Sequence, residues 1–247
     1  DFVKQIFTAS THDTILFFSN KGKLYKLRGY EIPEAGRTAK GTAIVNLLRL
    51  DNGEKISAVI PLSNFAEGKY LLMATKNGLI KKTALSEYNS NKKTGLLAIT
   101  LKEDDELIEV RLTDGEDNVV LVTSKGMCIT FDEKDVRPVG RSAQGVLGIR
   151  LDKEDFVIGM ESVIGGKNAT LLAITEHGFG KRTELEEYRV QNRGGKGVIT
   201  YKVTPKTGNI VGIRIANGDE DVMMITDKGT IIRLKVKEIS VLGRSTQ

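Results

Sequence analysis

Short apolar runs that end in the same polar turn recur along the whole chain. Each run is followed by Ser or Thr, two further residues and a glycine, and then by a second stretch of β-forming residues. The five segments are LFFSNKG, LMATKNG, LVTSKG, LAITEHG and MMITDKG, which end at Gly22, Gly78, Gly126, Gly178 and Gly229. This pattern is typical of a β-hairpin whose glycine takes a positive φ in the turn. We therefore predict at least one hairpin in each repeat.

The repeat continues beyond the hairpin in a fixed register. The hydroxyl residues three positions before the glycines are Ser19, Thr75, Thr123, Thr175 and Thr226. The expected buried anchors ten positions after them are Ile32, Tyr88, Val136, Tyr188 and Ile239. The cations fifteen positions after them are Arg37, Lys93, Arg141, Arg193 and Arg244. Further glycines follow at Gly41, Gly145 and Gly197, with Gly95 two residues early, and a β-strand pattern follows each of them.

Repeats spaced by about 50 residues, without long stretches of helical periodicity, indicate an all-β fold. Four strands in such a repeat are typical of a propeller blade, so we predict one disc-like domain over residues 1–247 with five visible repeats and five to six blades in the whole domain. DFV at 1–3 matches DFV at 155–157, inside a repeat. The two incomplete repeats at the chain ends either close a ring or mark a piece of a longer polypeptide that lacks part of the first blade, and we favour the second interpretation.

The composition excludes several classes of protein. Cys128 is the single cysteine, which excludes an internal disulfide framework, and with His12 and His177 it makes an implausible zinc site. No apolar run approaches the roughly 18 residues of a membrane-spanning helix, and the N-terminal residues lack a signal-peptide pattern, so a cytoplasmic location without membrane contact is expected. Lys and Arg number 37 against 32 Asp and Glu, a net charge of +5 that is compatible with a polyanionic partner.

Cations held in phase by the repeat make the case for nucleic acid. The position four residues after the hairpin glycine is basic in four repeats, with Thr130 as the exception. Because phase-matched residues of a ring lie on one circumference, they would form a belt for a phosphate backbone, without reading the base sequence. Each cation taken alone is equally explained as a solvated surface charge. The predicted DNA-binding residues are Arg37, Lys40, Lys92, Lys93, Arg141, Arg193, Lys196, Arg244, Lys26, Lys82, Arg182 and Arg233.

Two glycine-containing loops, Arg193–Gly197 and Arg141–Gly145, could let backbone N–H groups approach an anion. Their glycines are equally explained by turns that need a positive φ, and both interpretations can hold together. The segment GRTAKGT at 36–42 lacks the glycine-to-Gly-Lys-Thr spacing of a nucleotide-binding loop, so nucleotide binding is not expected there.

No catalytic residue is expected in this chain. The acidic clusters are interpreted as solvated turns ahead of strands rather than as acid–base pairs or metal ligands; they are Asp104, Asp105 and Glu106, and Asp219, Glu220 and Asp221. Tyr88 and Tyr188 share one repeat position and are interpreted as packing anchors. Cys128 falls in the second strand of a hairpin and is interpreted as a small core residue.

The segment QNRGGKG, at Gln191, Asn192, Arg193, Gly194, Gly195, Lys196 and Gly197, resembles the gyrase box of the C-terminal domain of the DNA gyrase A subunit. It departs from that motif at Asn192, where the family has a cation. Further blade-like motifs of the same family are VGRSAQGV at 139–146, NGLIKKTALSEY at 77–88, HGFGKRTELEEY at 177–188 and ISVLGRSTQ at 239–247. In the family the box marks the first blade, so the resemblance implies a box ahead of Asp1.

The resemblance implies a β-pinwheel, a propeller-like disc whose blades exchange strands and whose basic rim bends and wraps duplex DNA. It implies a parent protein that is an ATP-dependent type IIA topoisomerase, whose catalytic tyrosine lies in another domain. The implied partners are duplex DNA, the gyrase B subunit, and the rest of the gyrase A subunit, in an A2B2 complex at the bacterial nucleoid. No cofactor and no metal are expected in this chain. Two alternatives are the related domain of topoisomerase IV, from its own gyrase A paralogue, and a scaffold that binds an acidic protein.

Overall fold

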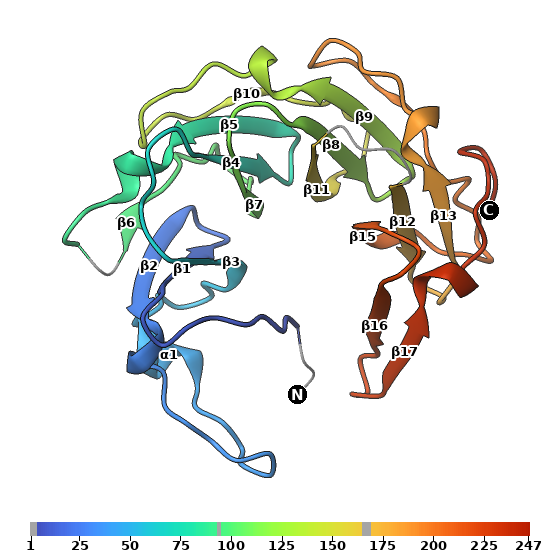
Figure 1. Cartoon of the computed structure of the whole chain (residues 1–247). Coiled ribbons are helices and arrows are strands. Elements are labelled where there is room, and N and C mark those ends of the chain that lie inside the picture. The colour runs from blue at the N-terminus through green and yellow to red at the C-terminus, as the bar shows by residue number, and fades with distance from the viewer. Residues whose placement is uncertain (1–3, 93–94, 165–168) are drawn as a thin grey trace. The chain divides into compact units, whose positions relative to one another are not determined.

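The computed structural model describes residues 4–92, 95–164 and 169–247, and its strands form antiparallel sheets (Figure 1). The central hairpins pair β1 (Thr14–Ser19) with β2 (Lys23–Arg28), β4 (Tyr70–Thr75) with β5 (Leu79–Ala84), β8 (Asn118–Thr123) with β9 (Met127–Asp132), β12 (Thr170–Thr175) with β13 (Gly180–Glu184), and β16 (Asp221–Ile225) with β17 (Ile231–Lys235). These are the five predicted hairpins, which are therefore confirmed.

The hairpin turns repeat the same local chemistry. The five glycines have φ values between 75° and 91°, and each glycine N–H donates to the carbonyl three residues earlier. In four turns the Ser or Thr hydroxyl also accepts the N–H four residues later, at distances from 3.0 to 3.2 Å. In the fourth turn the Thr175 hydroxyl instead donates to the Phe179 carbonyl. The predicted turn geometry, with a positive φ at glycine, is confirmed.

A third strand pairs with the inner strand of each of the first four hairpins. These strands are β3 (Ile56–Leu62), β7 (Leu107–Thr113), β11 (Val157–Val163) and β15 (Ile210–Ala216), and they pair with β1, β4, β8 and β12. The pairing register shifts once in every case, beside the Ser or Thr of the turn. The repeat in the sequence is thus also a repeat of pairing irregularities.

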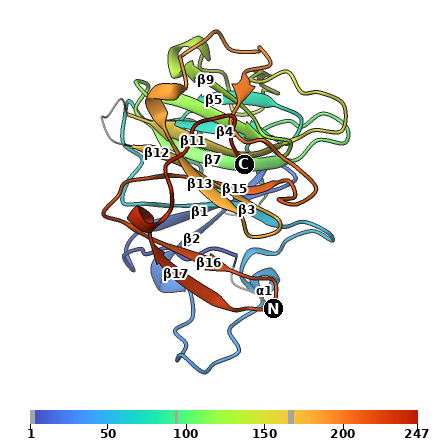
Figure 2. The same cartoon turned by 90° about the vertical axis from the view of Figure 1, so that its right-hand side faces the viewer.

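The fourth strand of a sheet comes from the following repeat. The short strands β6 (Leu96–Leu97), β10 (Val146–Leu147) and β14 (Val198–Ile199) follow β5, β9 and β13 in the chain, yet they pair with β2, β5 and β9. The described sheets therefore have the orders β3-β1-β2-β6, β10-β5-β4-β7, β11-β8-β9-β14, β13-β12-β15 and β16-β17. Figure 2 shows the hairpin β16–β17 as a two-stranded ladder. This exchange of strands is the arrangement of a β-pinwheel.

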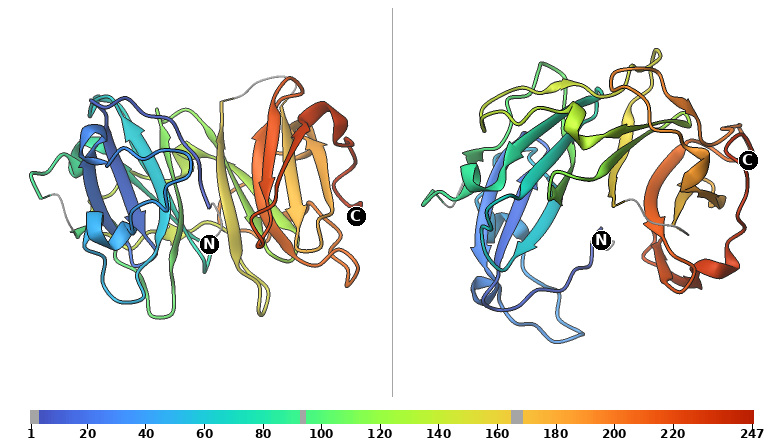
Figure 3. Two further views of the ribbon diagram at one scale, coloured as in Figure 1. Left: turned by 90° about the horizontal axis from the view of Figure 1, so that it is seen from below. Right: turned by 45° about the horizontal axis from the view of Figure 1, so that its top comes forward.

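The chain divides into two compact units. The first unit contains Thr8–Gly115 and Val136–Leu147, and the second contains Glu116–Asp135 and Gly148–Gln247 with the N-terminal segment up to Phe7. In the two views of Figure 3 the blue strands β1 to β3 lie side by side as a twisted sheet, as do the orange strands β12, β13 and β15. Each unit has its own core, built in the first around Leu71 and Tyr88 and in the second around Leu171 and Tyr201.

One-turn 3₁₀ helices follow the outer strands and lead into the exchanged strands. They are η1 (Gly29–Glu31), η2 (Leu85–Tyr88), η3 (Glu133–Asp135), η4 (Leu185–Glu187) and η5 (Val236–Glu238). The predicted anchors lie at their ends: Tyr88, Val136 and Tyr188 are buried, whereas Ile32 and Ile239 are partly buried. No helix within the described ranges is long and apolar enough to cross a membrane.

The strand expected after Gly41 is wrong, because that segment forms the short helix α1 (Ile44–Leu48). Elsewhere the equivalent strand pairs with the hairpin of the preceding repeat, and for this segment that hairpin is not among the residues of the sequence. Leu48 instead packs with Ile15, Phe17 and Tyr25 of the first sheet. The matching DFV motif at 1–3 lies outside the described residues.

Gly197 shows why the loop before an exchanged strand needs a glycine. Its φ is +75°, and a Cβ at this position would lie 2.1 Å from the Cys128 carbonyl oxygen of β9. Gly145 has the same role opposite β5, where a Cβ would lie 2.8 Å from the Ile80 carbonyl oxygen. A side chain here would push the exchanged strand away from its partner.

We predict that Gly197→Ala lowers the free energy of unfolding by about 2 kcal/mol or more, because it combines left-handed backbone strain with a steric clash. Gly195→Ala is the matched control, since the nearest atom to its Cβ would be 3.9 Å away, and it should change the stability by less than about 0.5 kcal/mol. Urea unfolding followed by circular dichroism measures both. Equal losses for the two variants would contradict this account.

Candidate nucleic-acid interface

The segments between the 3₁₀ helices and the exchanged strands carry the predicted cations, and we call them the exchange loops. They cover residues 89–95, 136–145 and 188–197, and the segments 32–43 and 239–247 match them in the repeat. Arg37, Lys40, Lys92 and Lys196 are exposed in these segments. Lys93 lies outside the described residues. Each unit therefore presents exposed positive charge on exchange loops.

Three arginines of the exchange loops are less exposed than expected. Arg141 donates through Nη1 to the Leu97 carbonyl at 2.7 Å, and Arg244 donates through Nη1 to the Ile199 carbonyl at 3.1 Å. Arg193 donates through Nε to the Asp135 carbonyl at 3.3 Å. The expectation of full exposure is wrong for these three residues, because each guanidinium also holds the protein main chain. A guanidinium has five N–H donors, so one such bond does not use up its capacity.

The box-like motif is tied to the second unit by its main chain. Gln191 N–H donates to the Thr130 carbonyl, and Gly194 N–H donates to the Gly148 carbonyl, both at 2.8 Å. The Gly194 N–H expected to face an anion is therefore engaged by the protein. Lys196 Nζ lies 2.7 Å from Asp152 Oδ1 in an ion pair whose side chains are 61% and 58% exposed. This exposed ammonium is the group of the motif best placed to meet an external phosphate.

The cations four residues after the hairpin glycines are mostly buried, so the predicted surface position is wrong for Lys26, Lys82 and Arg182. Lys26 Nζ donates to the carbonyls of Tyr88, at 3.1 Å, and Ser90. Lys82 lies over the Tyr70 ring with its Nζ 5.2 Å from the centroid. Arg182 Nε donates to the Ile239 carbonyl at 2.9 Å.

Lys26 and Arg182 thus bind the main chain of the next repeat from inside the sheet. Arg233, in the two-stranded hairpin, is exposed and donates through Nε to Asp221 Oδ2 at 2.7 Å.

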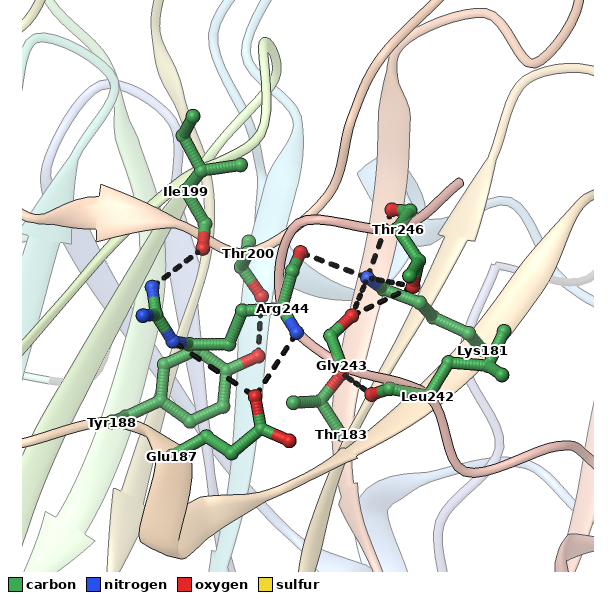
Figure 4. Close-up of polar contacts among 10 residues, drawn as sticks. All are labelled: Lys181, Thr183, Glu187, Tyr188, Ile199, Thr200, Leu242, Gly243, Arg244 and Thr246. Carbon is green, nitrogen blue, oxygen red and sulfur yellow. Dashed lines mark hydrogen bonds and ion pairs between the residues drawn. The ribbon is translucent and has the colours of Figure 1, made fainter.

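Sequence reasoning missed two lysines that lie under the exchange loops. Lys81 and Lys181 are each only 1% exposed. Lys181 Nζ donates to the carbonyls of Gly243, Arg244 and Thr246 at 2.7, 2.9 and 3.0 Å (Figure 4). The signal in the sequence is the pairs Lys81-Lys82 and Lys181-Arg182. Because neighbouring residues of a strand point to opposite faces, one cation of each pair must face inward if the other faces outward.

Burial lowers the pKa of both lysines. The pKa of Lys81 falls to about 7, mainly through burial and further through the nearby Arg141, while Glu87 acts in the opposite direction. The pKa of Lys181 falls to about 8, mainly through burial. A neutral amine still has two N–H donors, which is the number that Lys81 needs for the carbonyls of Ala98 and Arg141.

Comparison with known proteins relates the chain to one family. The family model "DNA gyrase C-terminal domain, beta-propeller" matches residues 13–63, 69–114, 117–164, 169–217 and 220–247. The chain belongs to this family. The DNA gyrase A subunit of Staphylococcus epidermidis is 47% identical over 248 residues, covering 100% of this chain and 28% of that protein. The DNA gyrase A subunit of Clostridium acetobutylicum is 53% identical over 245 residues, covering 99% of this chain and 29% of that protein.

Solved structures agree with this membership in the DNA gyrase C-terminal domain family. The crystal structure of the C-terminal domain of DNA topoisomerase IV matches with a TM-score of 0.86 and 31% identity, over 96% of this chain and 74% of that one. A structure of the DNA gyrase A C-terminal domain matches with a TM-score of 0.84 and 27% identity, over 96% of this chain and 77% of that one. The chain spans less than a third of the length of the full-length gyrase subunits it matches.

The remaining candidate groups of this gyrase-family domain have structural partners. Tyr88 is buried and donates its hydroxyl to the Ala98 carbonyl at 2.9 Å. Burial raises the pKa of Tyr188 to about 12 and that of the Cys128 thiol to about 12. The interpretation of all three as core residues is confirmed.

The acidic clusters lie at turns, but Asp105 is not solvated as expected. It is buried, and its Oδ1 accepts the N–H groups of Asn77, at 2.9 Å, and Glu106, at 2.8 Å, so it holds the neighbouring hairpin turn. In the other cluster Glu220 is exposed and accepts the Asn217 N–H at 2.7 Å. No group of three or more potential metal ligands occurs among the described residues.

The shifted pKa of Lys81 predicts a pH-dependent stability. Unfolded, the lysine keeps its proton to about pH 10.5, whereas in the native protein it releases that proton near pH 7. Between these values the unfolded state binds more protons, so this group makes the free energy of unfolding rise with pH. We expect the stability of the natural protein to rise relative to that of Lys81→Met between pH 6.5 and 9.5. Urea unfolding at several pH values measures this, and a constant difference would contradict it.

Proposed function

We propose that this chain binds duplex DNA through its exchange loops and bends it, as the DNA-wrapping domain of a DNA gyrase A subunit. The observation that carries the proposal is the recurrence of a cation-bearing exchange loop in successive repeats of a gyrase-family domain. Exposed ammonium and guanidinium groups contact phosphates without regard to base sequence, so binding is expected to be independent of sequence.

The proposed part played in the whole protein follows from the gyrase A relatives. In a type IIA topoisomerase, DNA wrapped on this domain would present a crossing of fixed handedness for strand passage, and the enzyme would introduce negative supercoils. The partners would be the gyrase B subunit, and the rest of the gyrase A subunit, in an A2B2 complex that binds and uses ATP. This chain would contribute DNA binding and no catalytic group, cofactor or metal, and it would act in the cytoplasm at the nucleoid.

Sequence identity favours gyrase over topoisomerase IV as the parent protein. The curated gyrase A subunits are 47% and 53% identical to this chain, whereas the solved topoisomerase IV domain is 31% identical. The folds of the two paralogous domains match this chain almost equally well, with TM-scores of 0.84 and 0.86. The shared fold therefore does not separate them, and the preference rests on the side chains.

The salt dependence of DNA binding tests the proposal. Replacing Arg193 and Lys196 together by Ala should remove about two phosphate contacts and reduce the slope of log K against log salt by roughly 1.8, equally for two unrelated DNA sequences. The double variant should still bind duplex DNA but bend it less, as measured by fluorescence energy transfer between labelled DNA ends. Unchanged binding and bending would show that this loop is only a turn. Salt-insensitive binding to an acidic protein instead would favour the scaffold alternative.

Asp152→Asn is the matched opposite variant. In the free protein Lys196 is paired with Asp152, so the carboxylate competes with a phosphate for the ammonium group. Removing its charge should strengthen DNA binding, and because the ion pair is exposed the gain should be only roughly two- to fivefold. Weaker DNA binding by Asp152→Asn would contradict a phosphate contact at Lys196.

A further inference from the structure

The two buried lysines occupy one repeat position and reach the same part of the next repeat. Lys81 follows Gly78 by three residues, and Lys181 follows Gly178 by three residues. Lys81 Nζ donates to the Arg141 carbonyl at 2.6 Å, and Lys181 Nζ donates to the Arg244 carbonyl at 2.9 Å. Arg141 and Arg244 are themselves equivalent in the repeat, fifteen residues after their own hairpin glycines. The contact is therefore made twice, once in each unit.

Each of these arginines is fixed at two points. Its carbonyl is held by the buried lysine, and its guanidinium donates to the exchanged strand, at Leu97 for Arg141 and at Ile199 for Arg244. Figure 4 shows both contacts around Arg244, with its main chain facing Lys181 and its side chain facing Ile199. This double attachment sets where the guanidinium leaves the protein surface.

Threonine hydroxyls reinforce the same loops. Thr100 Oγ1 donates to the Ser142 carbonyl at 2.7 Å, next to Arg141, and Thr183 Oγ1 donates to the Leu242 carbonyl at 2.9 Å, two residues before Arg244. The main chain of both Gly-Arg-Ser loops is thus bound by side chains of the neighbouring strands rather than by a regular strand ladder. A loop held in this way loses little conformational freedom when it meets a ligand.

The third hairpin provides an internal comparison. Ile129 occupies the position of the lysines there, and the exchange loop it faces reads Arg-Gly-Gly-Lys instead of Gly-Arg-Ser. That loop is held by main-chain hydrogen bonds, from Gly194 N–H to the Gly148 carbonyl and from Arg150 N–H to the Gly195 carbonyl, both at 2.8 Å. The hairpin itself therefore does not require a buried lysine, and the lysine accompanies the Gly-Arg-Ser loop.

We propose that Lys81 and Lys181 are positioning residues, which hold the Gly-Arg-Ser exchange loops so that Arg141 and Arg244 meet the phosphates of duplex DNA. The proposal rests on the proposed function, since the arginines matter only if these loops contact DNA. The lysines themselves are buried and touch no DNA. They act through the arginine carbonyls and lower the cost of ordering the loop on binding.

A double-mutant cycle on the whole chain tests the proposal. Arg141→Ala should weaken binding of a labelled duplex of about 40 base pairs roughly three- to tenfold and lower the salt slope by about 0.9, the loss of one phosphate contact. Lys81→Met should weaken binding in the same direction. In the Arg141→Ala background, Lys81→Met should change affinity less than about twofold, because the group that it positions is already gone.

The matched control combines Lys181→Met with Arg141→Ala. Lys181 holds Arg244 and not Arg141, so the two losses in affinity should multiply. A merely structural role for Lys81 would give the same factor for Lys81→Met whether or not Arg141 is present, and that result would overturn the proposal. Thermal melts of every variant identify losses of affinity that come from unfolding.

The outcomes separate the two proposals. If Arg141→Ala and Arg244→Ala both leave DNA binding unchanged, the Gly-Arg-Ser loops are not part of a DNA interface and the positioning role falls with them. If Arg141→Ala weakens binding but Lys81→Met has no effect, only the positioning role fails. If Lys81→Met does not fold, the Lys181→Met and Arg244→Ala cycle decides, and Thr100→Val combined with Arg141→Ala tests the same loop with a milder change.

Discussion

The backbone of the outer hairpin strand is the constraint on which the rest of this structure depends. An outer strand such as β5 or β9 has N–H and C=O groups on its free edge, and unpaired edges are unfavourable and invite aggregation. Here the following repeat supplies the missing strand, β10 or β14. The chain must therefore travel from its own hairpin to the edge of the previous sheet. That passage is the exchange loop, and the loop lies at the surface for the same reason that the edge does.

Buried cations make this passage definite. Taking an ammonium group out of water is costly unless hydrogen-bond acceptors replace the water, and main-chain carbonyls of the incoming segment provide them. Lys26, Lys181 and Arg182 all donate to such carbonyls from inside a sheet. An exchanged strand of two residues has few ladder hydrogen bonds of its own, so these side-chain contacts add directly to the attachment. Much of the positive charge counted in the sequence thus stabilises the fold, and the exposed cations on the loops remain for an external anion.

The sequence predicts the parts of the structure that depend on local chemistry. The hairpins, the positive φ at the turn glycines and the buried tyrosines follow from residue types at short, fixed spacings. The cations of the strands were misplaced because phase in a repeat shows that Lys26, Lys82 and Arg182 are equivalent, but not which way they face. That direction is set by acceptors about 60 residues further along the chain, such as the Arg141 carbonyl. The helix α1 was missed for a related reason, since its apolar residues suit a strand but a strand there needs a partner hairpin.

Strand exchange also means that the repeat in the sequence and the sheet in space are different objects. Each four-stranded sheet takes its outermost strand from the next repeat, so every junction joins an outer strand to an exchanged segment of the same kind. A whole repeat copied into the chain, or removed from it, would leave each remaining junction with an equivalent partner. A cut within a repeat would instead damage two sheets at once. The architecture is therefore modular under duplication of complete repeats, and its blade number can change in evolution without the design of a new interface.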